Sequence, residues 1–352
     1  MTLRILDTGL RPARWNVGMT AALAELHRTG RVGDTLRFYR APPAVLLGQH
    51  QNPKRAVDLA VCRRLNIDIA RRMTGGGAGY VSPGILGFDL IAERRDFGPS
   101  LSNAIAWICT GLAAGIARIG LPARYQPSGQ VVIDGRVIGR VTGTYNGLTL
   151  IVQGFVHIDA EAEPSRTGRR SKAGQRAPLE FMRPPEQLSG LSDFLGRVMQ
   201  PEEIVGILAA GLADKLKRAF TTVEIGAEQA ELAERFASDM EADPLALSTS
   251  SPDRGMLVAR QRAESGYIEA RVRLAPGARE IDEVRLAGDF SIAPTHAIHD
   301  LEMALRGLPA EAAADRARAL LEQSIVTISG VAPADIAAVI DAAVKSKPAR
   351  AP

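Results

Sequence analysis

Residues 71–80 read RRMTGGGAGY: two arginines stand near the end of a strand-like run at 67–73, and a cluster of glycines follows it. Glycine permits main-chain conformations closed to other residues and lets a ligand approach backbone N–H groups. The forked guanidinium groups of Arg71 and Arg72 are suited to a phosphate or a carboxylate. A tight turn with two solvated arginines explains the pattern equally well. The stretch is neither a Walker loop nor a GxGxxG turn that opens a helix.

Apolar periodicity on either side of this stretch predicts a chain of alternating helices and strands. Helices are expected at 16–27, 54–65, 100–119, 201–219 and 227–239, and strands at 35–40, 44–48 and 85–91. The apolar helix at 100–119 has Ser100 or Ser102 as its N-cap and Gly120 at its end.

Two dipeptides further along predict β-hairpins. Asp134-Gly135 separates QVVI from RVIGRVTGTY, and Asn146-Gly147 separates that run from LTLIVQGFVHI. Asp-Gly and Asn-Gly between β-rich runs are strong hairpin signals. The basic, polar residues 163–178 that follow are interpreted as a surface loop.

The C-terminal third of the chain has a different organisation. Residues 242–256 are rich in Ser, Pro and Asp and are interpreted as a linker. Beyond them, three strand-like runs precede helices near 294–306, 309–323 and 333–345. Strands followed by helices in a compact piece favour a small α+β domain. We therefore predict an α+β protein with a large domain at 1–241 and a smaller one at 257–352.

Composition limits the class of protein. The 352 residues are 46% hydrophobic and 23% charged, as in a globular chain. A net charge of +4, spread along the sequence, does not indicate a nucleic-acid partner. Cys62 and Cys109 show no disulfide or metal-ligand spacing, and His296 with His299 lacks a third ligand, so we predict no metal site and a cytoplasmic location. The apolar run 104–117 is too short to span a membrane.

Four separated motifs carry a resemblance to a known family. Residues 71–80 are similar to the signature RRxxGGGAVYHDxGN, and residues 43–53 (PAVLLGQHQNP) to PAVxxGRxQNP. Residues 134–139 (DGRVIG) stand where the family carries DG(R/K)K(I/V)xG, and residues 284–290 (VRLAGDF) resemble its GDFF strand. The chain thus resembles the lipoate–protein ligase A family of the biotin/lipoate A/B protein ligase superfamily.

The resemblance implies a central mixed β-sheet flanked by helices, a ligand cleft floored by the glycine turn, and a small accessory domain. It also implies two steps: lipoate or octanoate reacts with ATP and Mg²⁺ to give an acyl adenylate, which then acylates a lysine of a lipoyl-carrier domain protein. The residues it implies in contact with ATP or the adenylate, or in the same wall, are Arg71, Arg72, Gly75, Gly76, Gly77, Ala78, Gly79, Tyr80 and Gly139.

Departures from the family pattern gather around the expected reaction centre. Arg136 occupies the position of the catalytic lysine, so the resemblance makes it the catalytic residue of a divergent member. Arginine spreads its charge over a longer planar fork, and an outward-facing strand residue is the alternative interpretation. Gln130 replaces an acid, Val81-Ser82 replaces a His-Asp pair, and Gln153 replaces a histidine.

Related transferases of the superfamily use a cysteine just before a Pro-Ser element, where this chain has Arg124. Cys109 lies within the apolar helix, which disfavours acyl transfer through a thioester. Three hypotheses remain open: a working ligase that uses Arg136, a ligase for an unusual carrier, and a catalytically impaired relative that binds lipoyl groups or lipoylated proteins as an adaptor.

Overall fold

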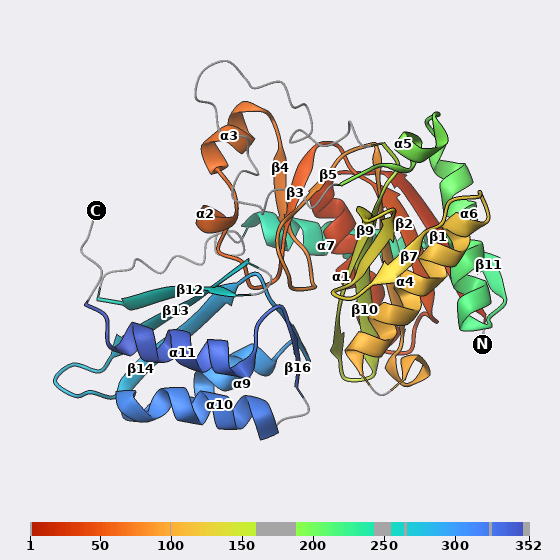
Figure 1. Ribbon diagram of the computed structural model, residues 1–352. Coiled ribbons are helices and arrows are strands. Elements are labelled where there is room, and N and C mark those ends of the chain that lie inside the picture. The colour runs from red at the N-terminus through yellow and green to blue at the C-terminus, as the bar shows by residue number, and fades with distance from the viewer. Residues whose placement is uncertain are drawn as a thin grey trace, which may run out of the picture.

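An eight-stranded mixed sheet forms the centre of the larger part of the molecule (Figure 1). The computed structural model describes residues 2–98, 100–159, 188–242, 255–263, 266–323 and 326–347. The strands of this sheet are β1 (Leu3–Leu10), β2 (Thr35–Arg40), β6 (Ile85–Glu93), β7 (Arg124–Gln126), β8 (Gln130–Ile133), β9 (Arg136–Asn146), β10 (Thr149–His157) and β11 (Phe220–Thr222). Their order is β11-β1-β2-β6-β10-β9-β8-β7. β1 runs parallel to β2 and β11, and the other neighbours are antiparallel.

Helices cover both faces of this sheet. On one face, called the α4 face, α4 (Leu101–Ala117) packs with α6 (Pro201–Leu216) over an apolar core. On the opposite face, called the α1 face, α1 (Ala13–Arg28) packs with α7 (Ala227–Ala242). The short helix α5 (Leu191–Leu195) lies beside the α4 core. This arrangement confirms the mixed sheet flanked by helices.

A small second sheet carries the glycine-rich stretch. β3 (Ala44–Leu47) pairs in parallel with β4 (Asp68–Arg71) and antiparallel with β5 (Gly79–Val81). Residues 74–79, called the glycine turn, connect β4 to β5. The turn therefore lies at one end of a sheet that is separate from the central one.

The helix expected at 54–65 is instead two short helices, α2 (Pro53–Ala56) and α3 (Leu59–Arg64). The break has a local cause, because the Asp58 carboxylate caps α3 by accepting two backbone N–H groups at 3.0 Å. The prediction of one continuous helix was wrong on this point.

The hairpins were predicted correctly. Asp134 and Gly135 join β8 to β9 with φ values of +48° and +75°, as a type I′ turn requires. β9 and β10 pair from Asn146–Thr149 onward. Ser100 caps α4 by accepting the N–H of Asn103.

The C-terminal elements form a second body with its own apolar core, called the C-terminal unit. Its elements are β12 (Leu257–Ala263), β13 (Gly266–Leu274), β14 (Ile281–Gly288), β15 (Ser291–Ala293), β16 (Thr327–Ser329), α9 (Ala297–Ala304), α10 (Ala313–Gln323) and α11 (Pro333–Val344). Figure 1 shows them in teal to dark blue below the α2 and α3 region. The α+β character is confirmed, and the domain boundaries stay predictions. Residues 243–254 of the expected linker, and the expected loop at 163–178, lie outside the described residues.

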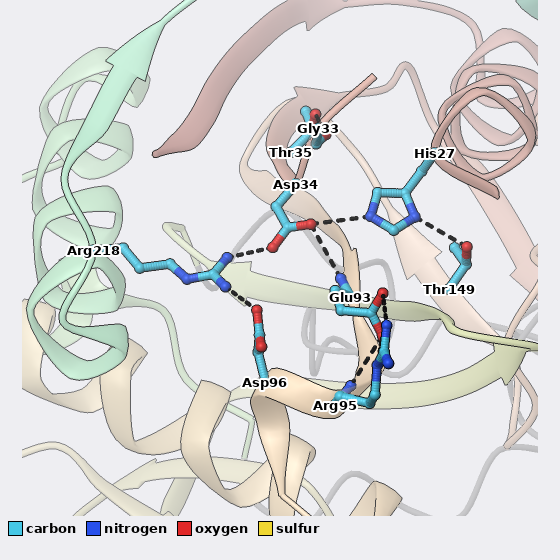
Figure 2. Close-up of polar contacts among 9 residues, drawn as sticks. All are labelled: His27, Gly33, Asp34, Thr35, Glu93, Arg95, Asp96, Thr149 and Arg218. Carbon is cyan, nitrogen blue, oxygen red and sulfur yellow. Dashed lines mark hydrogen bonds and ion pairs between the residues drawn. The ribbon is translucent and has the colours of Figure 1, made fainter. Parts of the chain in front are cut away.

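A cluster of polar side chains joins four elements at one end of the central sheet (Figure 2). Asp34 Oδ1 lies 3.0 Å from His27 Nε2 and accepts the N–H of Glu93 at 3.1 Å, while Arg218 donates to Asp34 Oδ2. His27 Nδ1 lies 3.0 Å from the Thr149 hydroxyl. Burial would raise the pKa of Asp34, but the hydrogen bonds from His27 and Arg218 outweigh it and hold that pKa below its ordinary value. In the described residues, no helix is long and apolar enough to cross a membrane.

Candidate active site

Arg71 holds the loop before α2 against β4. Its Nη1 donates to the carbonyl oxygens of Gly48, Gln49 and Gln51 at 2.9, 3.0 and 2.8 Å. The Gln49 N–H in turn donates to the Thr74 carbonyl at 2.9 Å. Arg71 therefore shapes the surroundings of the glycine turn, and its place in a ligand-binding wall stays a prediction.

Arg72 stabilises the glycine turn from inside the protein. Its side chain is almost fully buried, and its guanidinium donates to the carbonyl oxygens of Leu46, Gly75 and Gly77 at 2.9, 2.5 and 2.8 Å. Burial lowers the pKa of Arg72 to about 10, which keeps it charged at neutral pH. These bonds direct the guanidinium into the protein, where it holds the glycine turn in place. The expected contact between Arg72 and ATP stays a prediction.

The central sheet supports the turn from below through Gln153 on β10. Its Oε1 accepts the backbone N–H of Thr74 at 3.1 Å and the Thr74 hydroxyl at 3.0 Å. Thr142 on β9 also reaches Thr74, with the two hydroxyl oxygens 2.9 Å apart. Gln153 stands where the family pattern has a histidine, and here it positions the glycine turn.

A buried ion pair lies behind Gln153. Gln153 Nε2 donates to Asp89 Oδ1 at 3.1 Å, and Arg37 Nη1 donates to Asp89 Oδ2 at 3.0 Å. The Asp89 and Arg37 side chains are both fully buried. Arg37, Asp89, Gln153 and Thr142 face one another across β2, β6, β10 and β9. A polar row thus crosses four strands on the α1 face, directly beneath the glycine turn.

The C-terminal unit closes another side of the turn. The Gly76 N–H donates to the Phe290 carbonyl at 2.8 Å, and the Phe290 ring stacks on His50 with centroids 5.0 Å apart. Gln51 Nε2 donates to the half-buried Asp289 at 2.5 Å. These contacts tie the two sequence motifs at 43–53 and 284–290 together at the glycine turn.

The glycines of the turn serve different purposes. A side chain at Gly75 would overlap the backbone of residues 290–291, and Gly76 has φ +89°. A Cβ at Gly77 would meet nothing within 4 Å, and one at Gly79 would lie 3.6 Å from the Phe155 ring. Gly75 is therefore needed for packing and Gly76 for its backbone conformation, whereas Gly77 presents main chain to open space.

Ala78 and Tyr80 turn their side chains into the body of the protein. Both are buried, 6% and 7% exposed, in an apolar cluster with Val45 and Leu47. Their side chains thus anchor the turn, and any ligand contact from this stretch is left to the backbone.

Arg136 lies away from the glycine turn. It pairs with Ile133 of the α4-face core, and its guanidinium carbon is 5.4 Å from the centre of the Phe194 ring, which packs on the same core. Thr142, which touches the turn, is six residues further along β9, or about 20 Å. The expectation that Arg136 faces the turn is corrected by this placement on the opposite face.

Gly139 is likewise turned from the site. It pairs with Val131 and Val156, both members of the α4-face core, and a Cβ there would point among them. The pairing of β9 with β10 leaves no room for a side chain at Gly139, because a Cβ there would lie 2.9 Å from the Phe155 carbonyl oxygen. The structure therefore brings together the eight predicted site residues within 71–80 but brings neither Arg136 nor Gly139 to them.

Comparison with known proteins places the chain in a family. The Lipoyl protein ligase A/B catalytic domain matches residues 12–213. The chain belongs to this family. It is 27% identical to octanoyltransferase LipM of Symbiobacterium thermophilum over 60% of this chain and 86% of the relative. It is 24% identical to LipM of Kyrpidia tusciae over 69% of this chain and 97% of the relative.

Two solved structures show the same fold. P. falciparum LipL1 in complex with lipoate superposes with a TM-score of 0.71 at 12% identity, covering 92% of this chain and 95% of that one. Lipoate-protein ligase A bound with ATP gives a TM-score of 0.58 at 19% identity, covering 70% of this chain and all of that one. The first match includes the C-terminal region, so the additional body is part of the shared architecture. The family match and the LipM relatives, rather than these structures, make the chain an enzyme of the lipoate ligase class.

Neither cysteine of this lipoyl ligase family member is placed as a nucleophile. Cys62 and Cys109 are fully buried, and burial raises the pKa of the Cys109 thiol to about 12. A thiol needs its thiolate form to attack an acyl group, so both side chains are inert at neutral pH. Among the described residues, no three His, Cys, Asp or Glu side chains gather as a metal site.

The buried ion pair is the part of the site that sequence reasoning missed. Arg37 and Asp89 are charged residues in the middle of apolar strand runs, at 35–40 and 85–91. Opposite charges at the centre of two buried strands are a signal for an internal ion pair, because neither charge is tolerated there alone.

Proposed function

We propose that the chain is a lipoate–protein ligase that activates lipoate or octanoate with ATP. In the first step, a carboxylate oxygen of the fatty acid attacks the α-phosphorus of ATP, and pyrophosphate leaves. In the second, the ε-amine of a carrier lysine attacks the acyl carbonyl of the adenylate, AMP leaves, and the amine loses a proton. The products are an acylated carrier domain, AMP and pyrophosphate.

The observation that carries this proposal is the main chain of the glycine turn, which is fixed from several sides and open at Gly77. In the described part of the chain, the N–H groups of Gly77 and Ala78 donate to no other residue. Donors placed in advance stabilise negative charge that develops on a phosphate oxygen. An adenylating enzyme requires this at the α-phosphate.

Similar structures support the choice of ligands. One relative of this fold has been solved with lipoate and another with ATP. A bi-partite lipoate protein ligase from Thermoplasma acidophilum, of similar fold, is described together with its E2 lipoyl domain. We therefore propose a lipoyl-carrier domain as the acceptor. Mg²⁺ is proposed to arrive with the ATP phosphates, in keeping with its preference for phosphate and water oxygens.

Octanoyl transfer without ATP is the second candidate, and the LipM relatives favour it. Transfer through an enzyme thioester needs a reactive cysteine. The two cysteines of the chain are both buried, one of them with a pKa near 12. This burial argues for activation by a nucleotide.

The test incubates the purified chain with octanoate or lipoate, ATP and Mg²⁺, with and without a lipoyl domain, and follows acyl adenylate, AMP and acylated carrier by mass spectrometry. A parallel reaction contains octanoyl carrier protein and no nucleotide. Nucleotide-dependent acylation supports the ligase. Acylation only from the octanoyl carrier protein would replace it with the transferase, and binding of the adenylate without its formation would favour an adaptor.

A further inference from the structure

The three-stranded sheet of the C-terminal unit, β12-β13-β14, has one apolar face and one polar face. Ile268 and Ala270 of β13 are fully buried in the core of that unit. Side chains alternate along a strand, so Glu269 and Arg271 project from the opposite face. That face is turned toward α2 (Figure 1), and Arg55 of α2 lies 4.0 Å from the Glu269 carboxylate.

Arginines gather around Glu269 on this polar face. The fully buried Glu269 side chain accepts a hydrogen bond from Arg260 of β12 and another, at 2.7 Å, from Arg271. Arg262 stands two residues beyond Arg260, on the same side of β12. Together with Arg55, these four residues are called the arginine face. Burial would raise the pKa of Glu269, but the bonds from Arg260 and Arg271 outweigh it and hold that pKa below its ordinary value.

The arginine face carries more positive charge than its one buried carboxylate neutralises. Arg260 and Arg271 already satisfy both oxygens of Glu269. Arg55 and Arg262 add two further charges, and the side chains of Arg55 and Arg260 are 47% and 40% exposed. Arginine cannot lose its charge in a protein, so this excess is permanent. Exposed arginines are enriched where proteins meet, and an acidic partner would balance these.

The arginine face adjoins the glycine turn. Tyr267, on the same face of β13, accepts the Asn52 N–H at 3.2 Å, and the loop at 48–52 contacts the turn through Gln49. Arg55 is six residues beyond Gln49, which is at most about 21 Å of chain. A domain of about 100 residues has a radius of gyration of about 13 Å. A carrier domain whose lysine reaches the glycine turn is therefore wide enough to cover the arginine face as well.

We propose that the arginine face is the docking surface for an acidic face of the carrier domain that the chain acylates. This inference rests on the proposed function, because the partner is the acceptor of the acyl group. Carboxylates beside the target lysine would pair with the exposed guanidinium groups and bring that lysine to the turn. A group of four arginines is small for the many phosphate contacts that a nucleic acid makes, so a protein partner fits it better.

Arg55 and Arg262 supply the variants, because the buried carboxylate keeps both of its hydrogen bonds when they are replaced. The double variant Arg55→Gln/Arg262→Gln removes two exposed charges, and Arg55→Lys/Arg262→Lys keeps them. Arg118→Gln is the matched control, since Arg118 is 51% exposed and caps the end of α4, on the far face of the central sheet. Circular dichroism melting checks that each variant folds as the wild type does.

The measured quantity is the KM of each protein for a lipoyl domain of net negative charge, at saturating ATP and octanoate. At about 50 mM salt the glutamine double variant should raise this KM about three- to tenfold and change kcat less than about twofold, because exposed ion pairs with the carrier are lost. At about 300 mM salt the difference from wild type should shrink to less than about twofold, because salt screens exposed charges. The lysine double variant and Arg118→Gln should keep the KM of wild type.

An unchanged KM in the glutamine double variant at low salt overturns the inference, and acyl adenylate formed without any carrier shows that the ligase proposal still stands. An equal rise of KM in Arg118→Gln overturns it as well. If the glutamine double variant weakens binding of duplex DNA but leaves the KM for the lipoyl domain unchanged, the surface serves a nucleic acid instead. A wild-type chain that forms no adenylate and acylates no carrier rejects the proposed function, and the inference falls with it.

Discussion

Mild acid should loosen the contact between the C-terminal unit and the loop at 48–52, because His50 is buried there in its neutral form. The ring is 9% exposed, stacked on Phe290, and close to Arg71. Burial, reinforced by the Arg71 charge, lowers the pKa of His50 from 6.5 to about 4. The unfolded chain takes up the proton at the higher pH. Stability is therefore complete above the unfolded pKa and is lost as the pH falls from about 6.5 to about 4.

The expected loss follows from these two pKa values. At pH 5 the unfolded histidine is almost fully protonated and the folded one is not, which costs about 2 kcal/mol of unfolding free energy relative to pH 7. His50→Phe keeps a ring against Phe290 and cannot be protonated. Urea unfolding of both proteins, followed by circular dichroism at pH 7 and pH 5, isolates this contribution because every other group is common to the two chains. Equal losses of stability in wild type and His50→Phe would refute the reasoning.

Four further substitutions probe the buried ion pair, the glycine turn and the polar cluster around Asp34. Asp89→Asn leaves the buried Arg37 charge without a counter-ion and should lower the unfolding free energy by roughly 3–5 kcal/mol in urea titrations; a change under about 1 kcal/mol would mean that the pair contributes little. Gly75→Ala should lower the melting temperature, because its methyl group overlaps the C-terminal unit, whereas Gly77→Ala should melt as wild type yet form acyl adenylate at least about tenfold more slowly. Unimpaired adenylate formation by Gly77→Ala would show that the open main chain is not where the ligand binds. Asp34→Asn should be less stable than wild type at pH 7. The difference should shrink as the pH falls below about 4, because the unfolded chain then takes up a proton that the folded carboxylate, with its depressed pKa, takes up only at lower pH; a difference that does not change with pH would contradict this.

Local signals predicted the elements of the fold well, because their causes are local. The Asp134-Gly135 pair supplied the two positive φ values of its turn, and Ser100 supplied the cap of α4. The motifs at 43–53, 71–80 and 284–290, which the sequence shows only as separate segments, lie together in the structure. What could not be predicted locally was β1, whose parallel neighbours are distant in sequence.

The face on which Arg136 lies shows why the predicted site was partly misplaced. Arg136, Arg140 and Thr142 have even numbers, so a regular strand would project all three on one side. The register between β8 and β9 shifts at Val131–Val132, and Ile138 is the extra residue on β9. One extra residue reverses the side of the sheet on which the preceding side chains of β9 project. Arg136 therefore lies on the α4 face, whereas Arg140 lies on the face that carries the turn. The pattern of residue types in the sequence does not predict such a bulge.

The polar row beneath the glycine turn is explained by its effect on the main chain of the turn, which it holds in a fixed position. A fully buried Arg37 and Asp89 stabilise a fold less than apolar residues of similar size would, so stability alone does not explain them. Through Gln153 they fix both the N–H and the hydroxyl of Thr74, the first residue of the turn. Backbone donors can stabilise a developing phosphate charge only if they already stand in position when the reaction begins. The buried charges therefore serve the rigidity of the turn, and through it the proposed adenylation.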